Sequence, residues 1–144
     1  MKKRLFVSHI SEERNTAELF KTALNRDFLG MVEVLVSSDT ESIAAGEEWL
    51  RSIEKALHQC SVFVILCSPE SIRRPWINFE AGAAWMQHVP LIPVCHAGLL
   101  PRDLKIPLSL KNGVSLSKIR VMQVSLLAEI RRARTSACDT VTAI

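Results

Sequence analysis

The sequence predicts an α/β fold, in which helices cover both faces of a five-stranded parallel β-sheet. Short apolar runs alternate with helical patterns five times along the 144 residues, and this alternation is typical of βαβ units. The run from Ser61 to Cys67 is almost entirely apolar, as expected of a central parallel strand that is buried on both faces. The length of the chain and its 48% of apolar residues suit one globular domain.

The chain is predicted to begin with two strands and a helix between them. Leu5 to Val7 is predicted to be a buried strand, and a helix then begins at Ser11. Ser11 can cap this helix, and the two glutamates after it suit the positive end of the helix dipole. Residues 32–36 are rich in valine and are predicted to form the second strand, and the polar loop that follows ends at Gly46.

A second helix is predicted over residues 47–58, just before the apolar third strand. The third helix begins at Pro75, a residue that is accepted in the first turn of a helix, and ends near Gln87. Residues 91–94 are predicted to form the fourth strand. Pro93 lacks a backbone N–H, so we expect this strand to lie at a sheet edge, or the proline to lie at a strand end.

The rest of the chain is predicted to contain an irregular connection over residues 97–112, a short fifth strand near 113–116 and an amphipathic helix over 119–134. We place one domain at residues 1–134. The small and polar residues 135–144 are expected to form a frayed tail.

Charge, cysteine content and hydropathy exclude several classes of protein. The chain from residue 102 onward carries 8 Lys/Arg against 3 Asp/Glu, but no aromatic residues lie among these charges. A solvated helix face is therefore favoured over contact with nucleic acid. The four cysteines include no Cys-x-x-Cys pair, and no metal site is predicted. Neither a signal peptide nor an apolar stretch of the ~20 residues that a membrane span needs is present, which predicts a cytoplasmic protein without membrane contact.

The expected ligand site lies beyond the carboxyl ends of the strands, where the strand order reverses. With an assumed flavodoxin-like order of 2-1-3-4-5, this point lies between the first and third strands. The site is then expected to draw on Ser8, His9, the loop over residues 68–74 and the first turns of the third helix. A structural role and a ligand-binding role are both open for His9.

The third helix contains a single charged residue, Glu80, among apolar neighbours. Trp76 lies four residues earlier and shares a helix face with it. Composition alone favours a narrow exposed strip for Glu80 over a pocket. Gly82 costs ~1 kcal/mol relative to alanine in a helix interior, which suggests that another group approaches the backbone closely there. Three aromatic residues are assigned to the core: Phe63, Phe79 and Trp85.

Three segments resemble, in order and at the expected intervals, a TIR (Toll/interleukin-1 receptor) domain of the bacterial, NAD-cleaving type. Phe6-Val7-Ser8-His9 resembles the opening box of these domains, and residues 37–49 resemble the loop often called the BB loop. Trp76-Ile77-Asn78-Phe79-Glu80 matches their Trp-x-x-x-Glu arrangement. The resemblance covers roughly residues 4–95, and it implies the same strand order, 2-1-3-4-5.

The resemblance implies an activity, the cleavage of NAD at the nicotinamide–ribose bond to give nicotinamide and ADP-ribose or a cyclic form. NAD is then the substrate, and no cofactor is needed. The glutamate at the position of Glu80 is the catalytic residue of such domains. The candidate substrate-binding residues are Trp76, Ser8, His9, Asp39 and Arg74. A core anchor is the alternative role for Trp76, and a solvated loop position is the alternative for Asp39 and Arg74.

One carboxylate is chemically sufficient for this reaction. Hydrolysis of an ordinary glycoside needs two, because the leaving group must be protonated. The nicotinamide ring of NAD is already a cation and leaves as a neutral pyridine without a proton. A single carboxylate can then stabilise the positive charge that develops on the ribose.

Two other functions remain open. TIR domains also act as non-enzymatic scaffolds that associate with one another, and Glu80 would then be incidental. The resemblance further implies that self-association, often into filaments, switches on cleavage in innate immunity or antiphage defence. An upstream sensor protein or domain would supply the signal.

The second open function is that of a nucleoside deoxyribosyltransferase. These enzymes have a similar layout and use a glutamate at a ribose. A phosphoacceptor receiver domain is set aside, because Ser8-His9 and Cys67-Ser68 occupy the places of its acidic residues.

Overall fold

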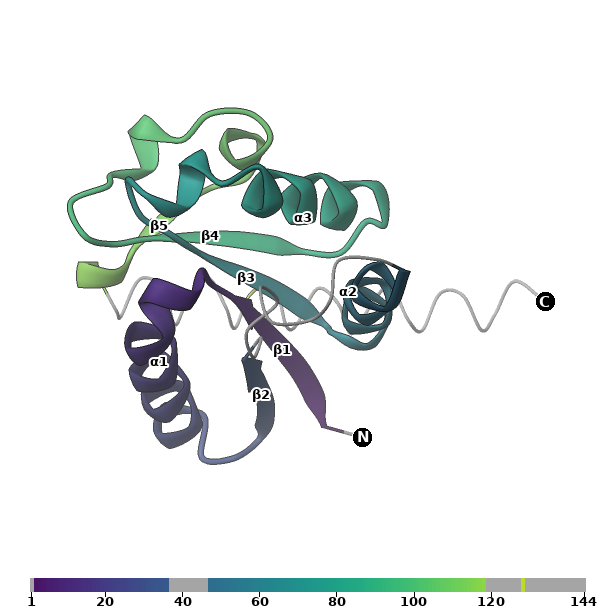
Figure 1. Cartoon of the computed structure of the whole chain (residues 1–144). Helices are drawn as coiled ribbons and strands as arrows, with labels where there is room; N and C mark the ends of the chain where they lie inside the picture. The colour runs from purple at the N-terminus through teal and green to yellow at the C-terminus, as the bar shows by residue number, and fades with distance from the viewer. Residues whose placement is uncertain (1, 37–46, 119–127, 129–144) are drawn as a thin grey trace.

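The computed structural model describes residues 2–36, 47–118 and 128, and its centre is a five-stranded sheet (Figure 1). All strand pairs are parallel, and the strand order is β2-β1-β3-β4-β5. The strands are β1 (Lys3–Ser8), β2 (Val32–Val36), β3 (Val62–Cys67), β4 (Leu91–Cys95) and β5 (Val114–Ser115). The predicted fold class and the predicted order 2-1-3-4-5 are both confirmed.

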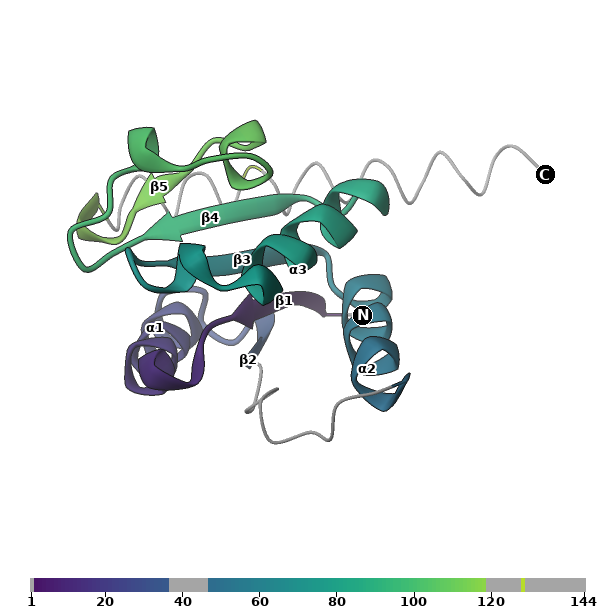
Figure 2. The same cartoon turned by 45° about the horizontal axis from the view of Figure 1, so that its top comes forward.

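Helices cover the two faces of the sheet. They are α1 (Arg14–Asp27), α2 (Glu47–Gln59) and α3 (Pro75–Met86). The apolar side of α1, including Phe20 and Leu24, packs on one face in a single core cluster. On the opposite face, Leu57 of α2 and Ile77 of α3 belong to a second core cluster. Figure 2 shows α3 running along the strands that it covers, β3 and β4.

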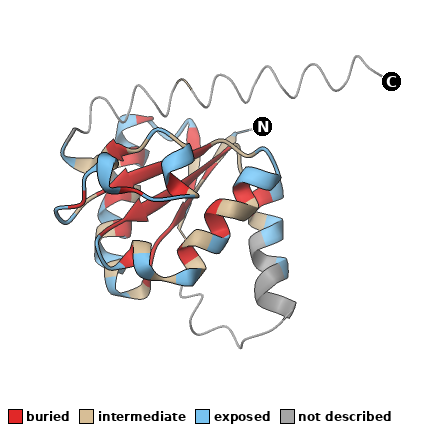
Figure 3. Cartoon of the chain, turned by 90° about the horizontal axis from the view of Figure 1, so that it is seen from above, coloured by how far each residue is buried: buried red, intermediate tan, exposed pale blue. Residues whose placement is uncertain are grey.

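Strand β3 is the centre of the core. All six of its residues are buried, and it pairs with β1 on one side and with β4 on the other. Figure 3 shows buried strands between helices whose outer faces are exposed. Burial on both sides explains why the sequence of β3 is a continuous apolar run rather than an alternating pattern.

The expectation that Pro93 marks an edge or a strand end is wrong. Pro93 is the middle residue of β4, which lies between β3 and β5. The hydrogen bonds from Phe63 N–H to the Pro90 carbonyl and from His96 N–H to the Cys67 carbonyl place the even-numbered residues of β4 towards β3. Pro93 therefore turns its nitrogen away from β3, and pairing with β5 begins only at Val94, so no ladder hydrogen bond is lost.

The start of the first helix also differs from the prediction. Ser11 opens a 3₁₀ turn, η1 (Ser11–Glu13), and its side chain does not cap α1, which begins at Arg14. The irregular connection after β4 contains two further 3₁₀ turns, η3 (Pro101–Asp103) and η4 (Leu108–Leu110). The predicted polar loop with Asp39, the tail over 135–144 and, except for residue 128, the helix over 119–134 lie outside the described residues.

Candidate functional site

The two residues that carry most of the predicted site lie in contact. The Ser8 hydroxyl donates a hydrogen bond to Oε2 of Glu80, although the residues are 72 positions apart in the sequence. Ser8 is the last residue of β1, and Glu80 lies in the second turn of α3. The contact therefore forms at the carboxyl ends of the strands, beside the point where the strand order reverses between β1 and β3.

Glu80 is buried because of its position on α3. The buried residues of this helix are Ile77, Glu80, Ala81 and Ala84, a spacing that places one helix face against the sheet. Glu80 is 0% exposed, so the exposed strip that composition favours is wrong. The helix is apolar on nearly every side, and for this reason the sequence gives no indication of which face turns inward.

Burial changes the ionisation of Glu80. Removal from water disfavours the charged form and raises the pKa of the carboxyl from its ordinary value of 4.5 to about 8, and the Ser8 hydrogen bond lowers it only in part. At neutral pH the carboxyl therefore holds a proton in this conformation. A carboxyl with a pKa displaced towards the working pH is a feature of functional sites, although structural carboxyls can share it.

Buried polar atoms at this end of the sheet include Oε1 of Glu80 and Nε2 of His9, which have no hydrogen-bond partner among the described residues. His9 is buried, and its Nδ1 lies 2.7 Å from the carbonyl oxygen of Ile10. Because a carbonyl can only accept, Nδ1 must carry the proton, and Nε2 of a neutral His9 is left as an acceptor. Buried polar groups are rarely left unpaired in proteins, so both atoms are suited to meet a ligand or a water molecule.

The loop between β3 and α3 is held by its own serines. The backbone N–H of Ser68 donates to the Ser71 hydroxyl, and the N–H of Ser71 donates to the Ser68 hydroxyl. The Ser71 hydroxyl also donates to the Leu66 carbonyl. The side-chain amide of Asn78 then donates to the carbonyls of Ile72 and Arg74. These bonds fix the start of α3 relative to the end of β3. Because Glu80 lies on α3, they also fix its position.

Arg74 links the loops that follow β1 and β3. It precedes α3 directly, and its guanidinium lies 2.8 Å from Glu12 and 3.3 Å from Glu70. A second link joins His96, after β4, to Glu13 at 3.1 Å. The roles of Glu12 and Glu13 were not found from the sequence, where these residues suit a helix dipole, because their partners are distant in the chain.

The aromatic residues of α3 lie differently from the sequence prediction. Phe63 is fully buried as expected, but Phe79 is 50% exposed and Trp85 is 46% exposed, so their assignment to the core is wrong. Both residues fall outside the inward face of α3. Phe79 stacks on the partly buried Trp76 with ring centroids 6.0 Å apart, and the Lys111 ammonium lies over the Trp85 ring.

Gly82 does not mark a close approach to the helix. A Cβ atom built at this position meets nothing within 4 Å, so that expectation from the sequence is also wrong. Asp39, the remaining candidate, lies outside the described residues. Of the six predicted site residues, the structure thus joins Ser8 and Glu80 directly and places His9, Arg74 and Trp76 on neighbouring segments.

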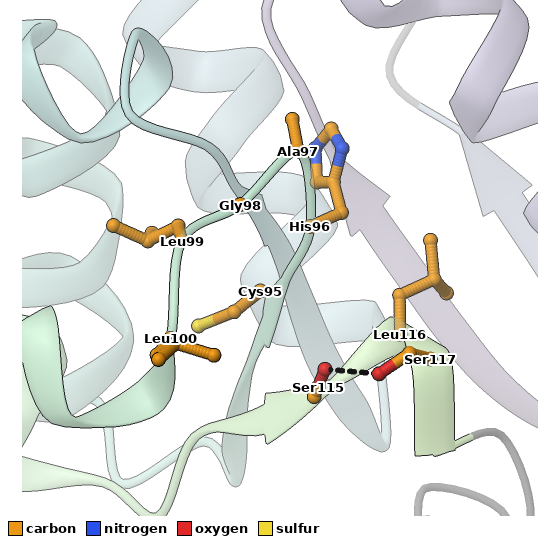
Figure 4. A pocket seen from close by; sticks show the side chains of 9 residues that line it. All are labelled: Cys95, His96, Ala97, Gly98, Leu99, Leu100, Ser115, Leu116 and Ser117. Carbon is orange, nitrogen blue, oxygen red and sulfur yellow. Dashed lines mark hydrogen bonds between the residues drawn. The ribbon is translucent and has the colours of Figure 1, made fainter.

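A cavity of about 410 Å³ lies at the carboxyl ends of β4 and β5 (Figure 4). It is lined by residues 95–100, which begin at the last residue of β4, and by residues 115–117, which begin at the last residue of β5; neither Ser8 nor Glu80 is among its lining residues. Its polar groups include the hydroxyls of Ser115 and Ser117, which are 2.8 Å apart. The cavity is therefore separate from the Ser8–Glu80 contact.

The described residues contain no group of three His, Cys, Asp or Glu side chains that could hold a metal ion. Cys60, Cys67 and Cys95 are free thiols. None of the described helices has the length and hydropathy that a membrane crossing requires. The described part of the candidate site offers a carboxyl, a hydroxyl and an imidazole.

Comparisons with known proteins agree with this architecture. The sequence model described as "TIR domain" matches residues 5–126. Among solved structures, the chain is similar to the TIR domain of the Toll-related Receptor TRR-2 from Hydra magnipapillata, with a TM-score of 0.62, 12% identity and coverage of 88% of this chain and 97% of that chain. It is also similar to a 3-dehydroquinate dehydratase-like protein from Bifidobacterium longum, with a TM-score of 0.50, 15% identity and coverage of 91% and 97%. At these identities the likeness shows the fold alone. No curated protein matches the sequence.

Proposed function

Because the chain belongs to the TIR domain family, we propose that it cleaves NAD at the nicotinamide–ribose bond, with Glu80 as the catalytic residue. The observation that supports this proposal is the position of Glu80. Its carboxyl lies where the strand order reverses, is held by Ser8 and keeps one buried oxygen without a protein partner among the described residues. Open α/β sheets bind their ligands at this place.

The proposed reaction breaks the bond between C1′ of the ribose and the ring nitrogen of nicotinamide. The bonding electrons go to the ring nitrogen, so nicotinamide leaves as a neutral molecule, and the positive charge passes to the ribose. The Glu80 carboxylate stabilises that charge as it develops. Water then adds to C1′ and loses a proton to give ADP-ribose, or a nitrogen of the adenine adds instead and gives a cyclic product.

For this reaction, the carboxyl of Glu80 must become accessible and must lose its proton. The carboxyl is fully buried and its pKa is raised to about 8, whereas the reaction needs an accessible carboxylate. A cation close to a carboxyl favours the charged form, and the nicotinamide ring of NAD brings such a charge. Access of water to the site acts in the same direction, because it removes the cost of desolvation.

Self-association is the step that we propose for exposing the carboxyl. TIR domains typically associate through contacts with other TIR domains, and the chain would then act in a defence or cell-death response in the cytoplasm, downstream of a sensor. Trp76 lies one turn before Glu80, and its partly exposed ring is a candidate for contact with a base of NAD. His9 and Arg74 are the further substrate-binding candidates that the structure describes.

A non-enzymatic scaffold is the second candidate function. It is favoured by the apolar surface of α3, where Phe79 and Met86 are 50% and 74% exposed, and by the full burial of Glu80. Exposed apolar side chains that lie together are a feature of protein–protein contact sites. In a scaffold, this surface would mediate association without any cleavage.

The test is nicotinamide release from NAD, measured by chromatography over a range of protein concentrations. Glu80→Gln keeps the shape of the side chain and removes its charge. Glu18→Gln is the matched control, because Glu18 is exposed on α1, at the other face of the sheet. The proposal predicts release by the wild type, a specific activity that rises with concentration, an unchanged rate in Glu18→Gln and no release in Glu80→Gln.

Light scattering on the same samples separates the two candidates. Association of both wild type and Glu80→Gln without nicotinamide release at any concentration would favour the scaffold. Release of nicotinamide that continues in Glu80→Gln would overturn the role of Glu80. Exchange of bases on deoxynucleosides, without action on NAD, would indicate a nucleoside deoxyribosyltransferase instead.

A further inference from the structure

We propose that Ser8 is a positioning residue for Glu80: its hydroxyl holds one carboxyl oxygen and thereby leaves the other to the ligand. This inference rests on the proposed function for the identity of the ligand. The contact itself rests on the described geometry, because the Ser8 hydroxyl donates to Oε2 while Oε1 is buried without a protein partner among the described residues.

Ser8 is suited to fix the orientation of another side chain. It is the last residue of β1, an interior strand of the sheet, and it pairs with Ile65 of β3. Ser8 is 0% exposed, and its short side chain has few rotamers. A donor on a buried strand is more rigid than a donor on a loop, and such rigidity supports a functional group within a narrow range of geometry.

The two oxygens of Glu80 consequently have different tasks. Oε2 is engaged by Ser8, and this bond fixes the plane in which the carboxyl lies. Oε1 is then the oxygen that is free to face the ribose of NAD, either the developing charge at C1′ or a ribose hydroxyl. Without Ser8 the carboxyl could rotate, and neither oxygen would have a fixed direction.

The hydroxyl also acts on the ionisation of Glu80. A hydrogen bond donated to a carboxylate favours the charged form, and Ser8 lowers the pKa of Glu80 against the larger effect of burial. Other titratable and charged groups lie around α3. Cys67 and Cys95 are thiols whose pKa burial raises, and His9 follows Ser8. The charged side chains are those of Glu70, Arg73 and Arg74, which precede the helix, and Lys111, which lies over the Trp85 ring. None of these contributes to the displaced pKa of Glu80.

The test that needs no activity is a titration of the Glu80 carboxyl by NMR, with ¹³C in the carboxyl carbon of glutamate. The signal of Glu80 is identified by its absence in Glu80→Gln. Ser8→Ala is expected to raise the titration midpoint by about one pH unit, and Ser109→Ala, at an exposed serine, is expected to leave it unchanged. The same midpoint in the wild type and in Ser8→Ala would overturn the proposal.

A second variant guards against a failure of Ser8→Ala to fold. Ser8→Cys keeps a side chain of similar shape and donates a weaker hydrogen bond, so a midpoint between those of the wild type and Ser8→Ala is expected. If Ser8→Ala does not fold and Ser8→Cys has the same titration midpoint as the wild type, the proposed role of Ser8 is contradicted.

Activity provides the readout that a merely structural role would not change. The acid limb of the pH profile for nicotinamide release is expected to move upward in Ser8→Ala, in the same direction as the NMR midpoint. A uniform loss of rate without such a movement would indicate a structural role only. If the wild type releases no nicotinamide at any pH, the proposed function fails, whereas the NMR titration still decides whether Ser8 acts on Glu80.

Discussion

Replacement of Glu80 by glutamine is expected to change how the stability of the fold depends on pH. Burial raises the pKa of Glu80 from 4.5 to about 8 in the folded chain. Between these values the folded chain keeps a proton that the unfolded chain has lost. Because the unfolded chain binds fewer protons in this interval, the free energy of unfolding of the wild type falls as pH rises.

The magnitude follows from the displaced pKa. Each pH unit in the interval between pH 4.5 and pH 8 lowers the free energy of unfolding by about 1.4 kcal/mol. This contribution is fully present below pH 4.5 and is smaller by about 3 kcal/mol at pH 7. Glutamine does not titrate, so the stability of Glu80→Gln relative to the wild type should increase by that amount over the same interval. The buried glutamine amide also changes the free energy of unfolding by an amount that does not depend on pH, and this constant difference does not alter the slope with pH.

Urea unfolding of both proteins at intervals from pH 4.5 to pH 8 measures the effect. Glu18→Gln serves as the control, since it makes the same replacement at an exposed position. Parallel pH profiles for the wild type and Glu80→Gln would refute the conclusion that Glu80 is buried with a proton.

Three further substitutions test the fold and the site. Phe63→Ala removes a fully buried ring from β3 and should lower the free energy of unfolding by about 3–5 kcal/mol. Leu19→Ala, at an exposed position, should change it by less than about 0.5 kcal/mol. Equal effects of the two substitutions in urea unfolding would contradict the assigned core. Gly82→Ala should stabilise the chain by about 1 kcal/mol, since a Cβ there meets open space in a helix, and a loss of stability in the same assay would show that the space is occupied. Arg74→Ala breaks exposed ion pairs and should lower the free energy of unfolding by at most about 1 kcal/mol. In the nicotinamide-release assay, the KM of this variant for NAD should rise and its kcat should be retained, whereas a fall in kcat at an unchanged KM would contradict a binding role.

Most of the sheet could be predicted from the sequence because its strands are buried on both faces. The apolar run from Ser61 to Cys67 is the least ambiguous strand in the sequence, and β3 covers Val62–Cys67. Pro93 was misleading for a physical reason. A proline is excluded only where its missing N–H would pair, and in β4 that position faces the side where β5 has not yet begun.

The site could be predicted only in part. The strand order places Ser8 near the start of α3, and the structure joins Ser8 to Glu80. The burial of Glu80 could not be predicted, because a helix that is apolar all round does not reveal its inward face. The same ambiguity led to the wrong assignment of Phe79 and Trp85. The links from Arg74 to Glu12 and from His96 to Glu13 join segments that are distant in the chain, and no local pattern indicates them.

The most direct test of the central claim is a comparison of nicotinamide release from NAD by the wild type and by Glu80→Gln, at equal and high protein concentration, at pH 7 and pH 9. If the carboxylate of Glu80 stabilises the ribose cation, the wild type releases nicotinamide at both pH values, and Glu80→Gln releases none at either pH. Equal rates for the two proteins at both pH values would contradict the claim that Glu80 carries the chemistry.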